Sequence, residues 1–309
     1  MCGDGVSQEA PLRVAFWNVE NFFDSRNDSL TNDDEFTPQG LRHWTRRRFE
    51  AKRDAICKGV AALDYPVVMG LAEVENDYVL QELLMGTPLR KFDYGFVHYD
   101  SPDARGIDCA LLYRKSHFIP YSTKSVCLSD STLLTRDILL VEGCTPQDDT
   151  LLLLVNHWPS KRGGVEAEQN RMRIAHKLRV MMDSLHRRHP AAVVLAMGDF
   201  NSSPDEDPVA LGMGFHCSDT NAEGLRNLMA SFPLSEGSYY YQGQWSMIDQ
   251  MFVTGPRERI ASLQAQLLRV SFLLVPDTGH LCERPFRTYQ GYRYQGGFSD
   301  HLPVFVDIR

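Results

Sequence analysis

Several apolar runs of this sequence end in residues that can bind a metal ion or carry a proton. The pairs that close these runs are Asn18 and Glu20, Glu73 and Glu75, Asn156 and His157, and Asp199 and Asn201. Continuous apolar runs are typical of strands buried on both faces, and the ends of such strands are where the sites of α/β sheets form. The set is rich in oxygen and has no thiol, which suits a hard cation such as Mg²⁺ or Mn²⁺. The pattern therefore predicts a metal-assisted site.

An Asp–His pair, Asp300 and His301, stands immediately before the last apolar segment of the chain. Imidazole has an ordinary pKa near neutrality, which suits a base that activates a water molecule. From Leu302 onward the residues alternate as they do in a half-buried strand, with Val304 facing one way and Phe305 the other. We expect this final strand to deliver both ionisable side chains to the predicted site.

Apolar periodicity predicts the elements that must position these residues. Strands are expected over 13–18, 67–74, 108–114, 150–158, 192–201, 246–255 and at the C-terminus, a hairpin over 238–245, and helices over 43–64, 77–85 (capped by Asn76) and 166–188. Strands and helices mixed along the whole chain favour an α/β sandwich. Because no repeat or linker divides the sequence, we expect a flexible N-terminal segment over 1–12 and a single domain over 13–309.

Composition excludes some classes of protein. The 309 residues carry a formal net charge of −8, which argues against tight, non-specific binding to DNA. Acidity does not exclude a nuclease, because a metal ion and a few basic residues can hold a phosphate. No apolar run reaches the roughly 18 residues of a membrane span, and the cysteines lack the spacing of a zinc site.

The N-terminus leaves two interpretations open. Cys2, followed by a polar segment, resembles the start of a bacterial lipoprotein whose signal has been removed, which would mean a lipid anchor at Cys2 and an exported or periplasmic protein. The alternative is a native start with a frayed tail, in a cytoplasmic protein. We expect a monomer.

Seven blocks of the sequence occur in the order found in the endonuclease/exonuclease/phosphatase superfamily, which has the DNase I-like fold. The blocks are "WNVENFFD" (17–24), "LAEVEN" (71–76), "GIDCALLYR" (106–114), "NHWPSKRGG" (156–164), "GDFNSSP" (198–204), "MIDQMFV" (247–253) and "FSDHLPV" (298–304). The chain resembles a bacterial member of this superfamily. The resemblance implies a four-layered α/β sandwich, two packed mixed β-sheets flanked by helices. It also implies hydrolysis of phosphate esters with Mg²⁺, or Mn²⁺ as the alternative.

The resemblance also implies a role for each matching residue. Glu73 resembles the principal metal ligand, with Asn18, Glu20 and Asp300 as its neighbours. His301 resembles the general base and Asp249 the carboxylate that orients it. By the same comparison, Asp199 and Asn201 lie near the scissile phosphate and the leaving oxygen, and His157 donates to a phosphate oxygen.

Four further residues are candidates for binding the substrate. Lys161 and Arg162 follow His157 in the same block and could hold substrate phosphates; a solvated pair of charges on a loop is the alternative. Arg287 lies in "CERPFRTYQGYRYQGG" (282–297), where arginines alternate with aromatic residues as in phosphate and base contacts; a packed loop is the alternative. Asp108 follows Arg105 and Gly106 and is expected to line the site.

Three functions fit these observations. The first is a metal-dependent phosphodiesterase of nuclease type, whose partner is nucleic acid. The second is a phosphatase or phospholipase-type hydrolase of small phosphoesters or lipid headgroups. The third is a catalytically silent binding protein on the same fold, although it should have lost the base or a metal carboxylate, and Glu73 and His301 are both present. A basic track one duplex groove wide would favour a polynucleotide, and a closed small pocket would favour a small ester.

Overall fold

The computed structural model describes residues 11–130, 133–214, 224–233 and 235–308. The predicted flexible segment over 1–12 and the lipid anchor at Cys2 therefore fall almost entirely outside the described residues. Within them, no helix is both long enough and apolar enough to cross a membrane.

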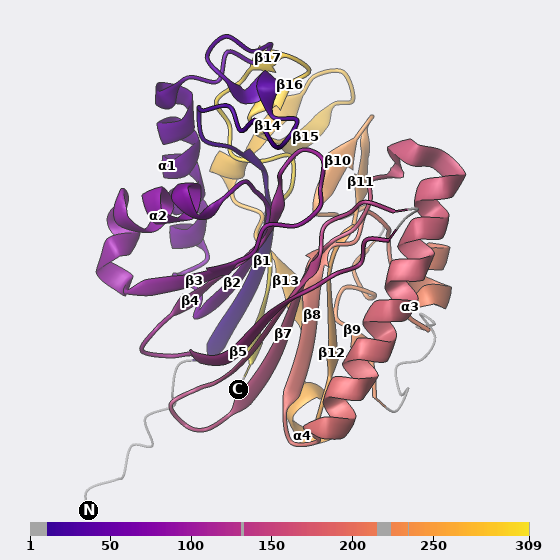
Figure 1. Ribbon diagram of the computed structural model, residues 1–309. Coiled ribbons are helices and arrows are strands. Elements are labelled where there is room, and N and C mark those ends of the chain that lie inside the picture. The colour runs from indigo at the N-terminus through magenta and orange to yellow at the C-terminus, as the bar shows by residue number, and fades with distance from the viewer. Residues whose placement is uncertain (1–10, 131–132, 215–223, 234, 309) are drawn as a thin grey trace, which may run out of the picture.

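Two six-stranded mixed sheets pack face to face (Figure 1). The first sheet has the order β13 (Ala265–Leu267), β18 (Val304–Ile308), β1 (Leu12–Phe22), β2 (Val68–Val74), β4 (Asp108–Arg114) and β3 (Tyr94–His98). The second has the order β5 (Ile119–Val126), β6 (Ile138–Cys144), β7 (Thr150–His157), β8 (Val193–Asp199), β12 (Asp249–Thr254) and β9 (Arg226–Asn227). In each sheet one central pair, β1–β2 or β7–β8, is parallel and the other pairs are antiparallel.

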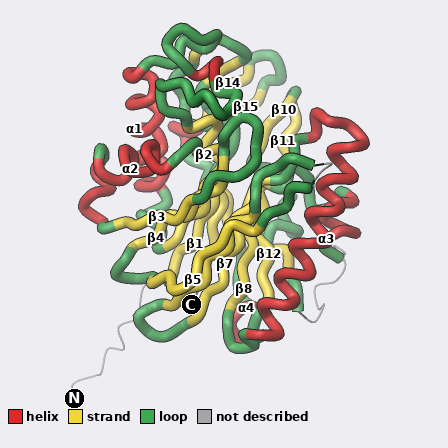
Figure 2. Tube along the Cα trace, in the orientation of Figure 1, coloured by secondary structure: helices red, strands yellow, loops and turns green. Residues whose placement is uncertain are grey.

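Helices cover the two outer faces, so the molecule has four layers (Figures 1 and 2). The α-helices are α1 (Arg46–Ala62) and α2 (Asp77–Met85) beside the first sheet, α3 (Gly164–Arg188) beside the second, and the short α4 (Arg257–Ile260). Single turns of other helix types are η1 (Asp34–Phe36), η2 (Pro88–Phe92), η3 (Lys161–Gly163), η4 (Pro208–Gly212) and η5 (Ser271–Leu273). The four-layered α/β sandwich expected from the sequence is confirmed.

Local sequence sets the ends of the helices. Asn76 caps α2 as predicted, because its side-chain oxygen accepts a hydrogen bond from the Val79 N–H at 3.1 Å. Thr45 caps α1 by accepting from the Arg48 N–H. The apolar spacing predicts a helix that begins at position 43, but this cap makes the helix begin at Arg46.

The core between the sheets is made of aliphatic side chains from both. Val68 and Leu111 from the first sheet and Val155 and Leu195 from the second are fully buried in one cluster. Each such side chain contributes about 1.5–3 kcal/mol relative to an exposed position. In β18, Val304 and Val306 belong to this inner cluster while Phe305 belongs to the outer one, as the alternation predicted. This packing fixes the position of one sheet against the other, and so the distance between the strand ends of the two sheets.

Three small hairpins stand at the end of the sandwich where β1 and β8 finish (Figure 1). They are β10 (Tyr239–Tyr241) with β11 (Gln244–Ser246), β14 (Leu274–Asp277) with β15 (Cys282–Pro285), and β16 (Tyr289–Gln290) with β17 (Arg293–Tyr294). The first is the hairpin predicted over 238–245. All three lie outside the two main sheets and form part of the surface around the predicted site.

Candidate active site

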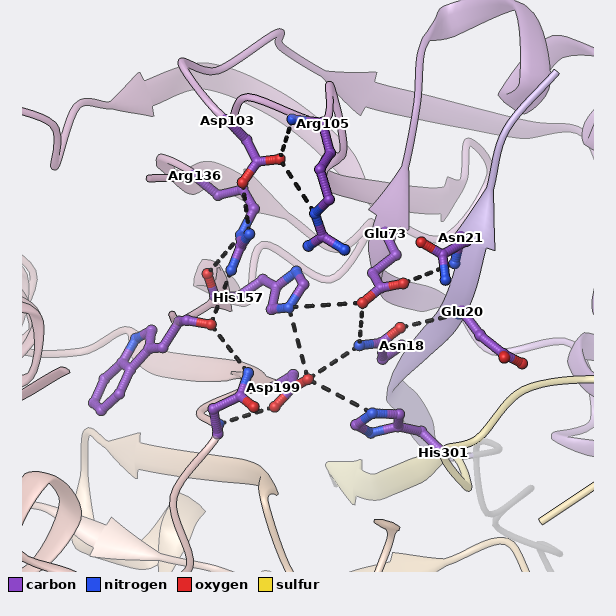
Figure 3. Close-up of polar contacts among 12 residues, drawn as sticks. Asn18, Glu20, Asn21, Glu73, Asp103, Arg105, Arg136, His157, Asp199 and His301 are labelled. Carbon is purple, nitrogen blue, oxygen red and sulfur yellow. Dashed lines mark hydrogen bonds and ion pairs between the residues drawn. The ribbon is translucent and has the colours of Figure 1, made fainter. Parts of the chain in front are cut away.

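Polar side chains from five strands meet at one edge of the sandwich, and Figure 3 shows those of Asn18, Glu73, His157 and Asp199. Asn18 and Glu73 come from the first sheet, and His157, Asp199 and Asp249 from the second. A direct hydrogen bond joins the sheets here, since Asn18 Nδ2 donates to Asp199 Oδ2 at 3.0 Å. The structure thus brings together residues that lie far apart in the sequence, as the strand-end pattern predicted.

Irregularities in the strands aim two of these side chains. The pairing of β2 with β4 shifts between Ala72 and Val74, which leaves Glu73 as an extra, bulged residue. Its φ of 65° lies in the left-handed region, which is uncommon for a residue other than glycine. Glu20, inside a similar shift of the β1–β2 pairing between Asn18 and Phe22, has a φ of 52°. Such conformations cost about 1–3 kcal/mol each and concentrate at functional sites.

The bulge points the Glu73 carboxylate into the polar cluster. Oε2 accepts a hydrogen bond from the Asn21 N–H at 2.8 Å. Oε1 lies 3.5 Å from Asn18 Nδ2 and 3.9 Å from His157 Nε2. Oε1 is therefore only weakly engaged by the protein and faces the space between the two sheets.

His301 and Asp249 form a buried dyad. His301 Nδ1 lies 2.7 Å from Asp249 Oδ2, and its Nε2 lies 3.7 Å from Asp199 Oδ2. The backbone around the ring is fixed, because the Trp17 indole N–H donates to the His301 carbonyl and the His301 N–H donates to Ser299 Oγ. Burial lowers the pKa of His301, but the charges of Asp249 and Asp199 outweigh it and raise that pKa to about 10.

Asp199 sits at the centre of the cluster and is 2% exposed. Burial raises the pKa of Asp199 to about 7, and the charge of Asp249 adds to that effect. The Asn201 N–H donates to Asp199 Oδ1 at 2.9 Å, while Asn201 Nδ2 donates to the Trp158 carbonyl. The backbone amide of Asn201 is therefore beside Asp199, and its side-chain amide is held by Trp158.

His157 faces the same cluster but is not a cation. Burial, followed by the charges of Arg136 and Arg105, lowers the pKa of His157 well below its usual value. Its Nε2 is 3.7 Å from Asp199 Oδ2, too far for a hydrogen bond. Its Nδ1 is buried without a partner. A neutral ring with an uncommitted N–H can donate to a phosphoryl oxygen.

Two arginines beside His157 were not among the residues singled out from the sequence. Arg136 is buried, donates to the carbonyls of His157 and Trp158, and pairs with Asp103 at 2.7 Å. Arg105 points its guanidinium into the site between His157 and Glu73 (Figure 3). Among the residues that the structure describes, its one ion-pair partner is the Asp103 carboxylate, at 3.8 Å. Its place after "SPDA" in a turn gives no local signal of this role.

Glu20 and Asp300 are both paired with Arg287 in this structure, and their role as metal ligands stays a prediction. Arg287 Nη2 contacts Asp300 at 2.8 Å, and its Nε lies 3.4 Å from Glu20. Glu20 also accepts the Thr288 N–H at 2.6 Å. Burial, then the charge of Asp300, raises the pKa of Glu20 to about 7. Arg287 is thus at the site, as expected for a substrate-binding residue, but its present partners are these two acids.

The other predicted substrate-binding residues make no hydrogen bond or ion pair with the cluster among the described residues. Lys161 pairs with Glu206 at 2.5 Å, and its neighbour Arg162 is exposed. Asp108 is buried against Ser101 and faces His98 rather than Glu73. For Lys161 and Asp108 the partners seen here offer no contact with the cluster, and their binding role stays a prediction.

The donor set fits a divalent metal ion. Asp199, Asp249 and His301 each offer a ligating atom within 4.8 Å of the others, and Asp249 Oδ1 is buried without a partner. Glu73 Oε1 adds a further weakly engaged oxygen. Carboxylate oxygens with few protein donors are what a hard cation requires. Because Asp249 and His301 bind each other, Glu73 and Asp199, with Asn18 between them, are the residues that would hold the ion.

Comparison with known proteins decides the family. The sequence model of the Endonuclease/Exonuclease/phosphatase family matches residues 13–309. The chain belongs to this family. Its members are divalent-metal-dependent phosphoesterases, so this chain is a phosphoesterase of the same family. Among curated proteins, none matches the sequence.

Solved structures of the family share the fold across the whole chain. The Bacteroides thetaiotaomicron mannosyl-6-phosphatase superposes with a TM-score of 0.62 at 16% identity, covering 96% of this chain and 99% of that one. The D. rerio TDP2 complexed with a single-strand DNA product gives 0.61 at 17%, covering 97% and 100%. The human Nocturnin catalytic domain with bound sulfate gives 0.59 at 16%, covering 97% and 94%. These likenesses show the fold of the chain and leave its substrate open.

Proposed function

We propose that this family member hydrolyses phosphate esters by attack of a water molecule that His301 activates, with Mg²⁺ as the metal ion. The observation that carries the proposal is the buried dyad of His301 and Asp249, whose free Nε2 faces Asp199 across from Glu73. His157 also lies near carboxylates at this meeting point, but only at 3.7–3.9 Å, whereas His301 is hydrogen-bonded to its carboxylate at 2.7 Å. This arrangement supports general-base catalysis, which typically contributes ~10²–10⁴-fold.

Each chain residue has a defined task in this mechanism. Asp249 holds the Nδ1 proton, so Nε2 of His301 is the atom that takes the proton from water. Asn18 ties Asp199 in place across the sheets, and Asn201 keeps an amide donor beside it. His157 donates a neutral N–H to a phosphoryl oxygen. When bound at Glu73 and Asp199, Mg²⁺ supplies positive charge that stabilises the oxygens of the phosphoryl group.

For the substrate, a cavity beside the dyad favours a small phosphoester. It has a volume of about 410 Å³, and Asp300 and Arg287 form the part of its wall next to the site. The β10–β11 and β14–β15 hairpins supply the rest, including Tyr241 and Arg284. This size and mixed polar and aromatic lining match a pocket for a small molecule. The nuclease-type substrate expected from the sequence is the second candidate, supported by the fold shared with a DNA-bound TDP2.

The test is hydrolysis by the purified chain with Mg²⁺, measured in parallel on a sugar phosphate, on a small aryl phosphodiester and on supercoiled plasmid. We expect turnover of a small ester that stops with chelator and falls at least ~10²-fold in His301→Ala. Nicking of plasmid without turnover of either small ester would select the nuclease. Retention of most activity in His301→Ala would contradict the assignment of the base.

A matched control separates loss of the base from loss of fold. His117→Gln changes an exposed histidine whose ring hydrogen-bonds the adjacent Ser116, so it should leave turnover unchanged. Far-UV circular dichroism of both variants checks that each remains folded.

A further inference from the structure

A second group of ligating side chains lies where β3 ends and β4 begins. His98 and Asp108 belong to these adjacent antiparallel strands, and Asp100 lies in the turn between them. Their ligating atoms all lie within 4.8 Å of one another. The side chains of His98 and Asp108 are 2% and 3% exposed, whereas Asp100 is exposed. The group is therefore a buried imidazole and carboxylate with an acidic residue at the opening.

Neighbouring residues fix both buried side chains and leave one atom of each free. Asp77 holds His98 Nδ1 at 2.9 Å. The Ser101 N–H donates to Asp108 Oδ1 at 3.1 Å, and the Ser101 hydroxyl donates to the same oxygen. The remaining atoms, His98 Nε2 and Asp108 Oδ2, are 3.7 Å apart, too far for a hydrogen bond. His98 Nε2 is buried without a hydrogen-bond partner, and Asp108 reaches it only as an ion pair.

This arrangement has the form of a metal site with its supporting residues. A metal-binding histidine usually gives its other ring N–H to a carboxylate, which fixes the tautomer that leaves the ligating nitrogen free. Asp77 does this for His98, and Ser101 does the equivalent for Asp108. A buried nitrogen with no partner is costly, and a metal ion would supply the missing contact.

We propose that His98, Asp100 and Asp108 bind a transition-metal ion of the Zn²⁺ type at a site separate from the catalytic one. One imidazole and two carboxylates match the ligands that Zn²⁺ accepts. Mg²⁺ prefers oxygen ligands alone and retains its water. The two sites of the chain therefore differ in metal preference.

The site stabilises a turn that reaches the catalytic cluster. Residues 99–107 connect the two strands and carry Asp103 and Arg105, which stand beside His157 (Figure 3). A metal ion between His98, Asp100 and Asp108 ties both ends of this turn together. Its occupancy thus fixes the position of Arg105 without any contact with substrate.

The experiment counts zinc bound by the full chain in the presence of excess Mg²⁺. The protein is stripped with chelator, dialysed against Zn²⁺, and its zinc content is measured by mass spectrometry. Because Zn²⁺ can also enter the catalytic site, where Asp199, Asp249 and His301 remain, the count is made in Glu73→Gln with and without Asp100→Asn, and the difference between the two assigns zinc to the His98 site. We expect Glu73→Gln to retain a zinc ion, and the added Asp100→Asn to weaken its binding at least about tenfold.

Three further variants separate a built site from zinc bound elsewhere on the surface. Asp100 is exposed, so Asp100→Asn should fold normally, and His98→Gln provides a second test of the same site. Cys127→Ser removes an exposed thiol and His117→Gln an exposed imidazole; both should keep the zinc. Zinc should also raise the Tm of Glu73→Gln but not that of the doubly substituted chain. If Glu73→Gln binds no zinc, or if Asp100→Asn binds it as tightly as before, His98 is only a protonated ring between Asp77 and Asp108 and the proposal is wrong.

Discussion

The charge on His301 is set by the two carboxylates that face it. Asp249 contacts one ring nitrogen at 2.7 Å and Asp199 lies 3.7 Å from the other. Together they overcome the effect of burial and raise the pKa of His301 to about 10. A base must be neutral to accept a proton, so positive charge near these carboxylates is needed to bring the pKa down. The metal requirement and the choice of base are therefore linked.

This linkage predicts how His301 titrates. In metal-free protein the ring should stay protonated at about pH 8, and Mg²⁺ should lower its midpoint, as followed by NMR of the imidazole carbons. Because the folded pKa lies above the unfolded value of about 6.5, the bound proton stabilises the fold fully below that pH. This contribution is lost as the pH rises through about 10. A metal-free midpoint near 6.5 would contradict the prediction, and Asp249→Asn should lower the midpoint.

Arg105 predicts a measurable effect on substrate binding. Its guanidinium points into the site, and its only ion-pair partner among the described residues is Asp103 at 3.8 Å. A hydrogen bond to a charged group contributes about 1.5–3 kcal/mol, so Arg105→Ala should lower kcat/KM about 10–100-fold. Arg105→Lys should recover part of the loss. Arg187→Ala, an exposed change on α3, is the control, and an Arg105→Ala enzyme with unchanged kcat/KM would exclude the contact.

The sequence located some of these residues and not others for a physical reason. Asp199, Asn201 and His301 sit at strand ends, where an apolar run stops abruptly, so their position is visible locally. Arg105 and Arg136 lie outside helices and strands, where the sequence has no apolar periodicity. Both pair with Asp103, a contact that the sequence does not reveal. The partners of Glu20 were equally hidden, because Arg287 comes from the opposite end of the chain.

At the level of elements, helix α1 is tied to the site by one buried lysine. Lys52 is 1% exposed, and its ammonium donates to Thr288 Oγ1 at 2.6 Å and to the Phe298 carbonyl. Burial lowers the pKa of Lys52 to about 8, although Glu20 and Asp300 act in the opposite direction. This lysine connects the helix layer to the loop that carries Glu20's partners.

Replacing Lys52 should therefore destabilise the fold as well as the site. Lys52→Met leaves Thr288 Oγ1 and the Phe298 carbonyl without their donor and removes a positive charge that acts on Glu20; breaking a buried charged contact typically costs about 3–5 kcal/mol. Urea unfolding measures the loss. Arg47→Met, exposed on the same helix, should change stability by less than about 1 kcal/mol. The deficit should shrink below pH 7, where Glu20, with its pKa of about 7, becomes neutral. An equal deficit well below and well above that pH would contradict this account.

The elements that the sequence predicted are those with long or regular apolar patterns. The strands β2, β4, β7 and β8, and the three long helices, appear where expected to within a few residues. The strands β3, β5 and β6 were not predicted. β5 is an edge strand, and most of its residues are half-buried. Its sequence therefore lacks the apolar run that would predict a strand. The bulge at Glu73 was not predicted either, because it depends on how β2 pairs with β4.

At the level of the whole molecule, the site exists only while the two sheets are docked. The hydrogen bond from Asn18 to Asp199 crosses between them, and the dyad combines His301, next to the first sheet, with Asp249 of the second. The distances within the cluster therefore depend on the distance between the sheets, and the aliphatic core determines that distance. A change in that core should alter catalysis even though it touches no catalytic residue.

Gly70 offers the sharpest way to change this distance. It lies on β2, and a Cβ added there would stand 3.1 Å from the Met197 methyl and 3.2 Å from both the Phe16 ring and Val155. Gly70→Val should therefore overpack the core, at a cost of about 1–3 kcal/mol, and lower kcat by separating Asn18 from Asp199. Val180→Ala, at a side chain that is 65% exposed on α3, should alter neither quantity. Denaturant unfolding and kcat are measured at a temperature where both variants are fully folded. If Gly70→Val loses stability but keeps full kcat, the spacing of the sheets does not control the site; if both fall together, the core between the sheets is part of the catalytic apparatus.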